Sequence, residues 1–395
     1  MESKTKVLSF ENTEIAFKSK SNADLQRAYW LFKLISINPL VKFGSYATNF
    51  ALKIGLPIQG IIKNTIFKHF CGGQNISDCE TAIQHLASYN VHTILDYSVE
   101  GEDTETDFNA TCEEILRTIQ RAQKDKHIPF SVFKVTGLGR FELLQKINAK
   151  EKLSDQENKE FENVKLRIDR ICKACFESDL QVLIDAEYSW IQDIIDDLAL
   201  EMMQKYNRQK PIVFNTYQLY RHDKLSSLKN DFQLAQSKEF YLGAKLVRGA
   251  YMELERDRAE EKEYPSPIQA TKEASDQDYN EALLFCLDHL DRIAFMAGTH
   301  NEESSRLLAI EIDKRNVPHN HPGIYFAQLL GMSDNLSFNL SASGYNVAKY
   351  MPYGPVKAVM PYLLRRAQEN TSVHGQTSRE LNLIIKEIER RKQSK

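Results

Sequence analysis

The sequence contains little of several features that mark specialised protein classes. Its 395 residues include only six cysteines, which is too few for a secreted scaffold held by disulfides. No stretch of about 18 uninterrupted apolar residues occurs, and a membrane-spanning helix needs at least that length. The net charge is -3 at pH 7, so no strong basic field attracts nucleic acid, and we expect no polynucleotide partner.

The N-terminal segment also lacks a targeting pattern. It carries Glu2, Glu11 and Glu14 and has no apolar h-region, which argues against a signal or transit peptide. The cysteines are scattered along the chain, as expected of reduced thiols. We therefore expect a cytoplasmic protein, or one bound peripherally to an inner membrane.

Motifs for several kinds of chemistry are missing as well. Cys172 and Cys175 form a C-x-x-C pair, but no second pair or Cys/His partner follows at ligand spacing, so we expect the interior of a helix there. The sequence has no His-x-x-x-His, Gly-x-Ser-x-Gly or Walker motif, and we expect no metal site.

The remaining composition is that of a globular protein, with 42% hydrophobic and 27% charged residues. Eight short apolar or β-branched runs alternate with amphipathic segments, which predicts βα units and a parallel sheet. A closed (βα)8 barrel, TIM-like but distorted, fits the length of about 250 residues. An open doubly wound sheet is the alternative, although no Gly-x-Gly-x-x-Gly follows any run. The predicted strands are Val91 to Tyr97, Phe130 to Val135, Leu180 to Ala186, Ile212 to Tyr217, Tyr241 to Val247, Ile293 to Thr299, Ile324 to Leu330, and Val347 to Met351.

Two regions follow from this pattern. We expect an N-terminal helical arm over residues 1–88 and a barrel with a C-terminal helix over residues 89–395. Residues 150–170 are predicted to form a solvated helix before the third strand. Residues 253–276 are predicted to be a polar connection interrupted by prolines, either a lid over the site or a surface loop.

Polar and charged residues end most of the predicted strands. Barrel enzymes place catalytic groups at the C-terminal ends of their strands, so we expect these side chains to converge on one mouth. A lysine inside an apolar strand needs a compensating partner, and Lys134 has two: a substrate group, or Asp185 in a structural ion pair. The strand-end residues are Asp96, Tyr97, Lys134, Asp185, Glu187, Asn215, Tyr217, Lys245, Arg248, Tyr251, Thr299, His300, Asn301, Gln328 and Tyr350.

A second cationic feature follows the last strand. After Tyr350 to Pro355, helical spacing places Tyr362, Arg365, Arg366 and Glu369 in one sector of a helix. Guanidinium groups bind carboxylates bidentately and stay charged near pH 7. The pair therefore suits a small amino or keto acid, and a solvated Arg/Glu face is the alternative.

Taken in order, these segments resemble the proline dehydrogenase family, the flavin enzymes that oxidise L-proline to Δ1-pyrroline-5-carboxylate. The resemblance covers most of the chain from about residue 91 to residue 370 and is closest to the monofunctional, mitochondrial-type branch. It is carried by Phe133-Lys134, Leu183 to Glu187, Phe214 to Gln218, Lys245 to Tyr251, Gly298 to Asn301, and Tyr362 to Arg366 with Glu369-Asn370.

The resemblance implies a role for each site residue. Arg365, Arg366 and Lys134 would hold the substrate carboxylate, and Tyr350 and Tyr251 would enclose the ring. Asp185 would lie in a polar network beside Lys134, and Glu369 would orient an arginine. FAD would be bound by Asn215, Lys245, Arg248, Gly249, Thr299, His300, Asn301 and Gln328. At two positions this chain departs from the bifunctional bacterial members of the family that it resembles, which carry glutamine in place of Asn215 and arginine in place of Lys245.

The implied activity is the first step of proline catabolism, by hydride transfer to FAD N5, with electrons passed to a quinone. A peripheral membrane contact is then expected, on the matrix side of the inner mitochondrial membrane if the source is eukaryotic. The apolar residues Phe43, Leu52, Ile54, Leu56, Ile61, Ile62 and Phe67, interleaved with lysines, predict either an interfacial helix or packing against the barrel.

Three other functions stay open at this stage. The first is hydroxyproline dehydrogenase, a function of the same enzyme class. The resemblance implies a smaller residue at the position of Tyr350 in that enzyme, which makes room for the ring hydroxyl, so Tyr350 favours proline. A Schiff-base aldolase using Lys134 would need no flavin. A binding protein without catalysis is the third, which the many ionisable strand ends disfavour.

Overall fold

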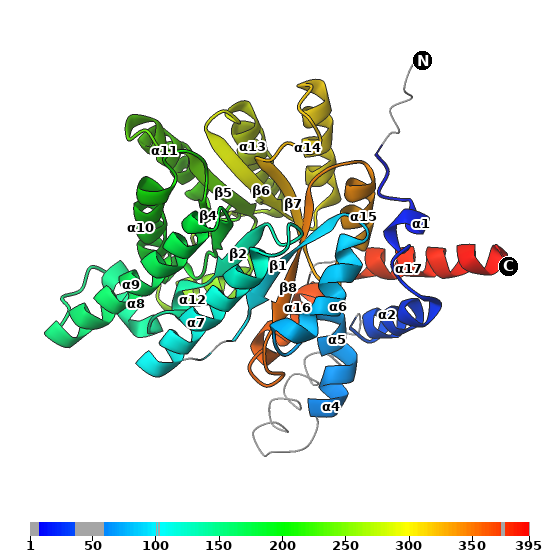
Figure 1. Ribbon diagram of the computed structural model, residues 1–395, viewed down its shortest axis with the longest axis horizontal. Helices are drawn as coiled ribbons and strands as arrows, with labels where there is room; N and C mark the ends of the chain where they lie inside the picture. Colours follow the sequence, from blue (N-terminus) through cyan, green and yellow to red (C-terminus); the bar gives the residue numbers. More distant parts are fainter. Residues whose placement is uncertain (1–7, 36–58, 100, 102, 373–375, 395) are drawn as a thin grey trace. The chain divides into compact units, whose positions relative to one another are not determined.

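The computed structural model describes residues 8–35, 59–99, 101, 103–372 and 376–394. Eight parallel strands close into a barrel in chain order, which confirms the predicted (βα)8 architecture and excludes the open sheet (Figure 1). The strands are β1 (Val91–Tyr97), β2 (Phe130–Phe133), β3 (Gln181–Ile184), β4 (Val213–Gln218), β5 (Leu242–Val247), β6 (Ile293–Gly298), β7 (Ile324–Leu329) and β8 (Val347–Tyr353).

Apolar runs predicted these strands because parallel strands in a barrel are buried on both faces. All four residues of β2 and all six of β4 are buried. Inside the barrel, the ring of Phe130 lies 5.7 Å from Phe214 and 4.9 Å from Tyr325, edge to face. These rings come from non-neighbouring strands, so they meet in the interior, and their positions identify which side of each strand faces inward.

Contacts divide the chain into two units, residues 102–327 and residues 1–101 with 328–395. We call them unit 2 and unit 1 and describe each by itself. The predicted boundary between an arm at 1–88 and a barrel at 89–395 stays a prediction. Among the described residues, no helix is both long and apolar enough to cross a membrane.

Unit 2 places helices around strands β2 to β6 (Figure 1). Several begin at side-chain caps that satisfy the free N–H groups of the first turn. Ser154 and Glu157 form a capping box that starts α9, the helix predicted over 150–170. The helices are α7 (Glu105–Ala122), the 3₁₀ turn η2 (Val135–Gly137), α8 (Phe141–Asn148), α9 (Asp155–Glu177), α10 (Ser189–Tyr206), α11 (Lys224–Ser237), α12 (Met252–Glu261), α13 (Lys272–Asp288) and α14 (Glu302–Lys314).

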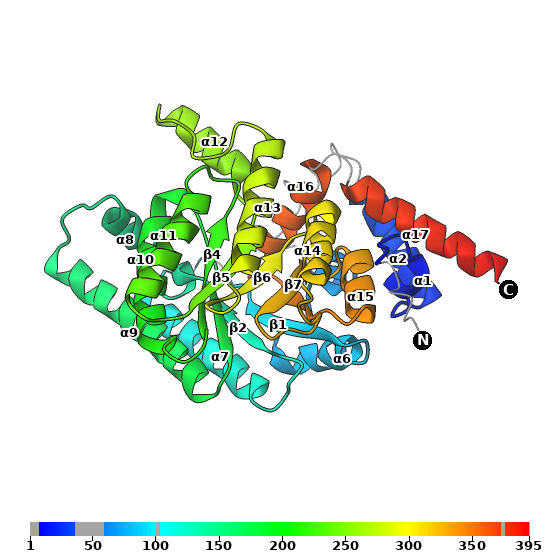
Figure 2. The same ribbon diagram turned by 90° about the horizontal axis from the view of Figure 1, so that it is seen from above.

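The segment 253–276, predicted to be a polar connection interrupted by prolines, contains most of one helix, α12, and the start of another, α13. In Figure 2, α12 projects beyond the other helices of this unit. Only Glu255 and Ala259 of this helix are buried, so it lacks the apolar stripe by which amphipathic helices are identified from sequence. The prolines, Pro265 and Pro267, lie in the turn between α12 and α13.

Unit 1 combines both ends of the chain with β1 and β8. Figures 1 and 2 both show α1, α2 and α17 side by side. Buried Phe17, Leu25 and Phe32 pack there with Leu383 and Ile384 of α17. The helices are α1 (Thr13–Ala16), α2 (Asn22–Ile35), α4 (Gln59–Ile62), the π-helical turn η1 (Lys63–Phe67), α5 (Lys68–Phe70), α6 (Ile76–Ala87), α15 (Asp334–Ala342), α16 (Met360–Ser372) and α17 (Gln376–Gln393).

Two apolar residues of the predicted interfacial segment are packed inside unit 1. Ile62 and Phe67 belong to a buried cluster with Val359, Met360 and Leu363. This agrees with packing rather than a membrane surface for these two side chains. Residues 36–58, which include Phe43, Leu52, Ile54 and Leu56, and the side chain of Ile61 lie outside the described residues.

Candidate active site

A buried ion pair joins two of the predicted site residues at the C-terminal ends of their strands. Lys245 Nζ lies 2.6 Å from Asp185 Oδ1, with side chains 9% and 14% exposed. Register explains the contact: Thr216 pairs with Lys245 across β4 and β5, and Asp185 follows Ile184, which pairs with Asn215. Asp185 and Lys245 thus lie on either side of Thr216. The lysine that forms the described ion pair with Asp185 is therefore Lys245, on β5.

Glu187 forms a second buried acidic site just after Asp185. Its carboxylate accepts hydrogen bonds from the Thr136 amide at 3.0 Å and the Thr136 hydroxyl at 2.5 Å. Burial raises the pKa of Glu187 to about 6, although the Thr136 hydrogen bonds and the Lys134 ammonium oppose the shift. Through Thr136, this carboxylate links the end of β3 to the turn that Lys134 begins.

The side chains of β4 alternate between the helices and the barrel interior. The Asn215 amide donates to Asp196 of α10 at 2.9 Å, and Tyr217 donates to Asp231 of α11 at 2.8 Å. Asn215, predicted beside the flavin, is therefore not brought together with Asp185 and Lys245. Phe214 faces the interior, so Gln218 lies on the inward face with it.

Gln218 is a candidate site residue that sequence reasoning missed. Its Nε2 donates to the Glu187 carbonyl at 2.9 Å, whereas its buried Oε1 has no hydrogen-bond partner. A buried acceptor without a partner is costly, so this oxygen suits a donor on a ligand. Period-two alternation from Phe214 could have identified it.

The Arg248 side chain, just after β5, contacts residues that follow β6 and residues of α13. Its Nε lies 2.7 Å from Asp276 Oδ1, and its two terminal nitrogens donate to Thr299 and Ser304 at 2.9 Å. The guanidinium also lies 4.3 Å from the Tyr279 ring centre. Thr299 is thus brought together with Arg248, as predicted.

The first turn of α14 lies beside this arginine. Asn301 is its N-cap, and its side-chain oxygen accepts from the Ser304 backbone N–H at 2.9 Å. The backbone N–H of Asn301 donates to the Thr299 hydroxyl at 3.0 Å. His300 lies between them and is half-buried. Helix N-termini attract anions, and with Arg248 this end of α14 could hold phosphate groups.

Gly249 and Tyr251 connect β5 to α12. Gly249 has φ of 144°, and a Cβ there would lie 2.3 Å from the Tyr220 ring, so only glycine fits. Tyr251 is buried, and its ring centre lies 4.4 Å from Tyr188. Buried Glu255 accepts from the Ser189 amide at 2.7 Å and its hydroxyl at 2.5 Å, which ties α12 to the start of α10.

In unit 1, Tyr350 and Gln328 are both buried. The Tyr350 carbonyl accepts from the Leu330 amide at 2.8 Å. Gln328 Oε1 accepts from Ser337 of α15 at 2.8 Å. The first contact joins β8 to the segment that follows β7, and the second joins the end of β7 to α15.

The predicted arginine pair lies on α16. Arg366 is only 8% exposed, and its guanidinium lies 5.3 Å from the ring centre of Tyr362, one turn earlier. A fully solvated Arg/Glu face therefore does not describe Arg366. Arg365 is half-buried. Glu369 belongs to α16, but its side chain lies outside the described residues.

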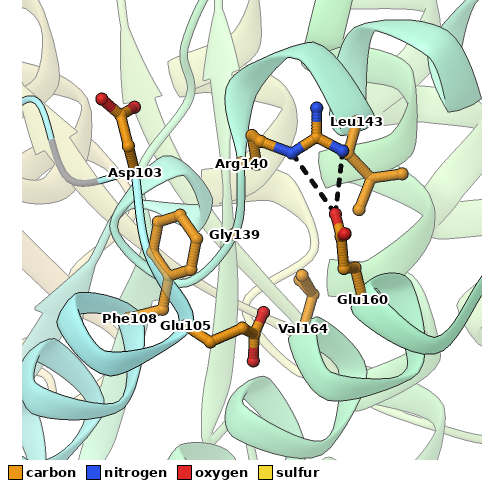
Figure 3. Close-up of a pocket in the computed structure, with 8 residues that line it drawn as sticks. All are labelled: Asp103, Glu105, Phe108, Gly139, Arg140, Leu143, Glu160 and Val164. Carbon is orange, nitrogen blue, oxygen red and sulfur yellow. Dashed lines mark hydrogen bonds and ion pairs between the residues drawn. The ribbon is translucent and has the colours of Figure 1, made fainter. Parts of the chain in front are cut away.

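A separate cavity of about 90 Å³ lies among α7, α8 and α9 (Figure 3). Arg140 crosses it and bonds Glu160 at 2.8 Å. None of the predicted site residues lines this cavity. Its walls are Asp103, Glu105, Phe108, Gly139, Arg140, Leu143, Glu160 and Val164.

Cysteine and metal chemistry find no support in the described part of the chain. All six thiols are free and buried, and burial raises the pKa of both Cys172 and Cys175. The pair lies inside α9, as predicted. Within the described residues, no three His, Cys, Asp or Glu side chains are grouped as a metal site requires.

Comparison with known proteins adds independent information. A sequence-family model described as "Proline dehydrogenase" matches residues 79–379. "Proline dehydrogenase 1, mitochondrial" of Dictyostelium discoideum is 33% identical over 96% of this chain and 74% of its own length. "Hydroxyproline dehydrogenase" of Xenopus laevis is 30% identical over 97% of this chain and 90% of its own.

A solved structure supports the fold. Proline utilization A (PutA) from Bdellovibrio bacteriovorus, inactivated by N-propargylglycine, superimposes with a TM-score of 0.71 at 19% identity. The match covers 94% of this chain and 40% of the PutA chain. At this identity the likeness concerns the fold alone.

Proposed function

Because this chain belongs to the proline dehydrogenase family, we propose that it oxidises L-proline to Δ1-pyrroline-5-carboxylate. The reaction removes a hydride equivalent from ring carbon C5 and a proton from the ring nitrogen, and a C5=N double bond forms. The observation that carries the proposal is the buried Arg366 beside Arg365 on α16, within the segment that the family model matches.

The arginine pair supplies binding and orientation. A guanidinium shielded from water binds a carboxylate more strongly than an exposed one, because screening is weaker. Holding the substrate by its carboxylate fixes which ring atom is presented for reaction, which lowers the entropic part of the barrier. Tyr350 and Tyr251 are proposed to enclose the ring, and Lys134 to add a further positive charge.

We infer that the cofactor is FAD, because the residues present fit it. The partnerless Gln218 Oε1 can accept a hydrogen bond from a flavin ring N–H. Arg248, Thr299 and the α14 N-terminus can face phosphate oxygens. When bound, FAD supplies the two-electron acceptor for the oxidation.

The other predicted cofactor contacts stay proposals. Lys245, His300, Asn301 and Gln328 are proposed to face the cofactor, and Gly249 to allow close approach of the β5 backbone. Asn215 is proposed to act indirectly, through its hydrogen bond to Asp196 of α10.

The electron acceptor and the cellular location are finer proposals. We propose that electrons pass to a membrane quinone, which requires at least transient contact with a membrane surface. The relatives named mitochondrial are consistent with the matrix side of the inner membrane. Sedimentation with liposomes, compared between the full chain and a variant without residues 36–58, tests the membrane contact.

Hydroxyproline is the second candidate substrate, because one relative carries the name hydroxyproline dehydrogenase. Buried Tyr350 favours proline, since a bulky ring leaves less room for an added hydroxyl. The ratio of kcat/KM for the two substrates decides between them. If kcat/KM is higher for hydroxyproline than for proline, hydroxyproline is the substrate.

The direct test uses the purified chain reconstituted with FAD. Anaerobic L-proline should bleach the flavin absorbance. Arg366→Met should raise KM for proline on the order of 100-fold, because a buried charge-assisted contact is lost. Arg170→Met is the matched control, since Arg170 of α9 is 57% exposed, and it should leave KM unchanged.

Two results would contradict the proposal. One is unchanged proline kinetics in both Arg366→Met and Arg365→Met. The other is a colourless protein that borohydride traps covalently at Lys134 with a carbonyl substrate, which would identify the aldolase alternative.

A further inference from the structure

Lys349 of β8 is a buried lysine that none of the roles above uses. Its side chain is fully buried, with 0% of the residue exposed. Burying an ammonium costs several kcal/mol unless its hydrogen bonds are met. An apolar residue of similar size would fill this space at lower cost, so the ammonium group calls for a specific explanation.

The ammonium binds the turn between β7 and α15, residues 329–333, which we call the β7–α15 turn. Nζ donates to the Leu329 carbonyl at 3.3 Å and to the Met332 carbonyl. It also lies 2.9 Å from Asp334 Oδ1, at the start of α15. The next residue of β8, Tyr350, accepts from the Leu330 amide. Two consecutive β8 residues therefore hold one turn.

Other charged groups lie near Lys349 and this turn. Lys20 lies 3.0 Å from the second oxygen of Asp334. Burial raises the pKa of Asp334, but Lys20 and Lys349 outweigh it and hold that pKa below its usual range. Glu380 of α17 accepts from the Ser333 amide. Lys20 and Lys349 thus both pair with Asp334, and Glu380 accepts from the backbone of the turn.

The turn is also connected to α16. The Met332 side chain is buried in one cluster with Met360, Tyr362 and Leu363. These three residues form the first turns of α16, immediately before Arg365. Movement of the β7–α15 turn would therefore shift the base of the helix that carries the arginine pair.

From these contacts we propose that Lys349 is a positioning residue for substrate binding. Its ammonium holds the β7–α15 turn, and through that turn it sets the positions of Tyr350 and of α16 with Arg365 and Arg366. The proposal rests on the proposed function, in which these side chains bind the ring and the carboxylate.

The test compares Lys349→Met with Lys20→Met in the flavin-loaded full chain. Both variants remove one cation from Asp334, but only Lys349 belongs to β8 and donates to the turn carbonyls. Lys349→Met should raise KM for proline about tenfold with little change in kcat. It should weaken binding of tetrahydrofuran-2-carboxylate, an analogue without the ring N–H, by the same factor. Lys20→Met should lower the thermal midpoint while KM stays unchanged.

The outcomes separate this inference from the function itself. Equal KM values in the two variants would overturn the positioning role. If Lys349→Met does not fold, Met332→Ala tests the same link without altering a charge, and an unchanged KM there would overturn it too. If the unaltered chain does not oxidise proline, the proposed function fails and this inference fails with it.

Discussion

The Asp185–Lys245 pair makes a quantitative prediction about burial and charge. At 2.6 Å and an effective dielectric constant of about 20, the attraction is about 6 kcal/mol before desolvation is subtracted. Removing one partner of a buried pair costs about 3–5 kcal/mol, and the exposures of 9% and 14% place this pair near the lower value. We therefore expect Asp185→Asn and Lys245→Met each to lower the free energy of unfolding by about 3 kcal/mol.

A double-mutant cycle isolates the pairwise contribution from other contacts of the two side chains. The free energy of unfolding of the flavin-free protein is measured in urea for both single variants and the double variant. We expect a coupling free energy of about 2 kcal/mol, because the double variant leaves no unpaired charge.

The matched control is the exposed pair Lys229–Glu281, at 2.5 Å with side chains 39% and 48% exposed. Its coupling should stay below about 1 kcal/mol. Equal coupling in the two cycles would refute the reasoning, because it would mean that burial at the barrel mouth does not strengthen the Asp185–Lys245 attraction.

Three further predictions concern other buried groups. Burial, and then the Asp334 charge, raise the pKa of Glu380 to about 7. Protonated Glu380 therefore adds to the free energy of unfolding; this contribution is complete below about pH 4.5 and is lost as the pH rises through about 7. Glu380→Gln should therefore flatten the fall in thermal midpoint between about pH 5 and about pH 8, and an unaltered slope would contradict this. Gln218→Leu should weaken FAD affinity in titration calorimetry about tenfold, whereas unchanged affinity would exclude Oε1 as a ligand acceptor. Native Cys172 and Cys175 should not react with a thiol reagent at pH 8 until the protein is unfolded, and rapid native labelling would disprove their burial.

Short apolar runs were sufficient to predict the strands, because parallel strands of a barrel are largely buried on both faces. The predicted run Val91 to Tyr97 coincides with β1, and every other run overlaps its strand. The predicted end at Met351 falls short of β8, which continues to Tyr353. Pro352 has no N–H to donate and would usually end a strand. Here β8 stays in register with β1 beyond it, with Pro352 opposite Asp96 and Tyr353 opposite Tyr97.

Side-chain partners were harder to predict, because they depend on register between strands. Sequence alone left two explanations for Asp185, and it could not show that Lys245 would reach it across β4 and β5. It named Asn215 as a site residue and did not name Gln218, although of these two side chains it is Gln218 that faces the interior. A shift of one residue in the register moves every inward-facing side chain of a strand to its outward face.

The sequence by itself determined the barrel, the helix that carries the arginine pair and the family to which the chain belongs. These rest on local patterns: apolar runs, helical spacing and short motifs read in order. Only the tertiary structure decided that α12 is a helix, that Arg366 is shielded from water, and that Lys349 is enclosed by groups from distant segments. Burial and ion pairing join residues far apart in the chain, so no local pattern contains them.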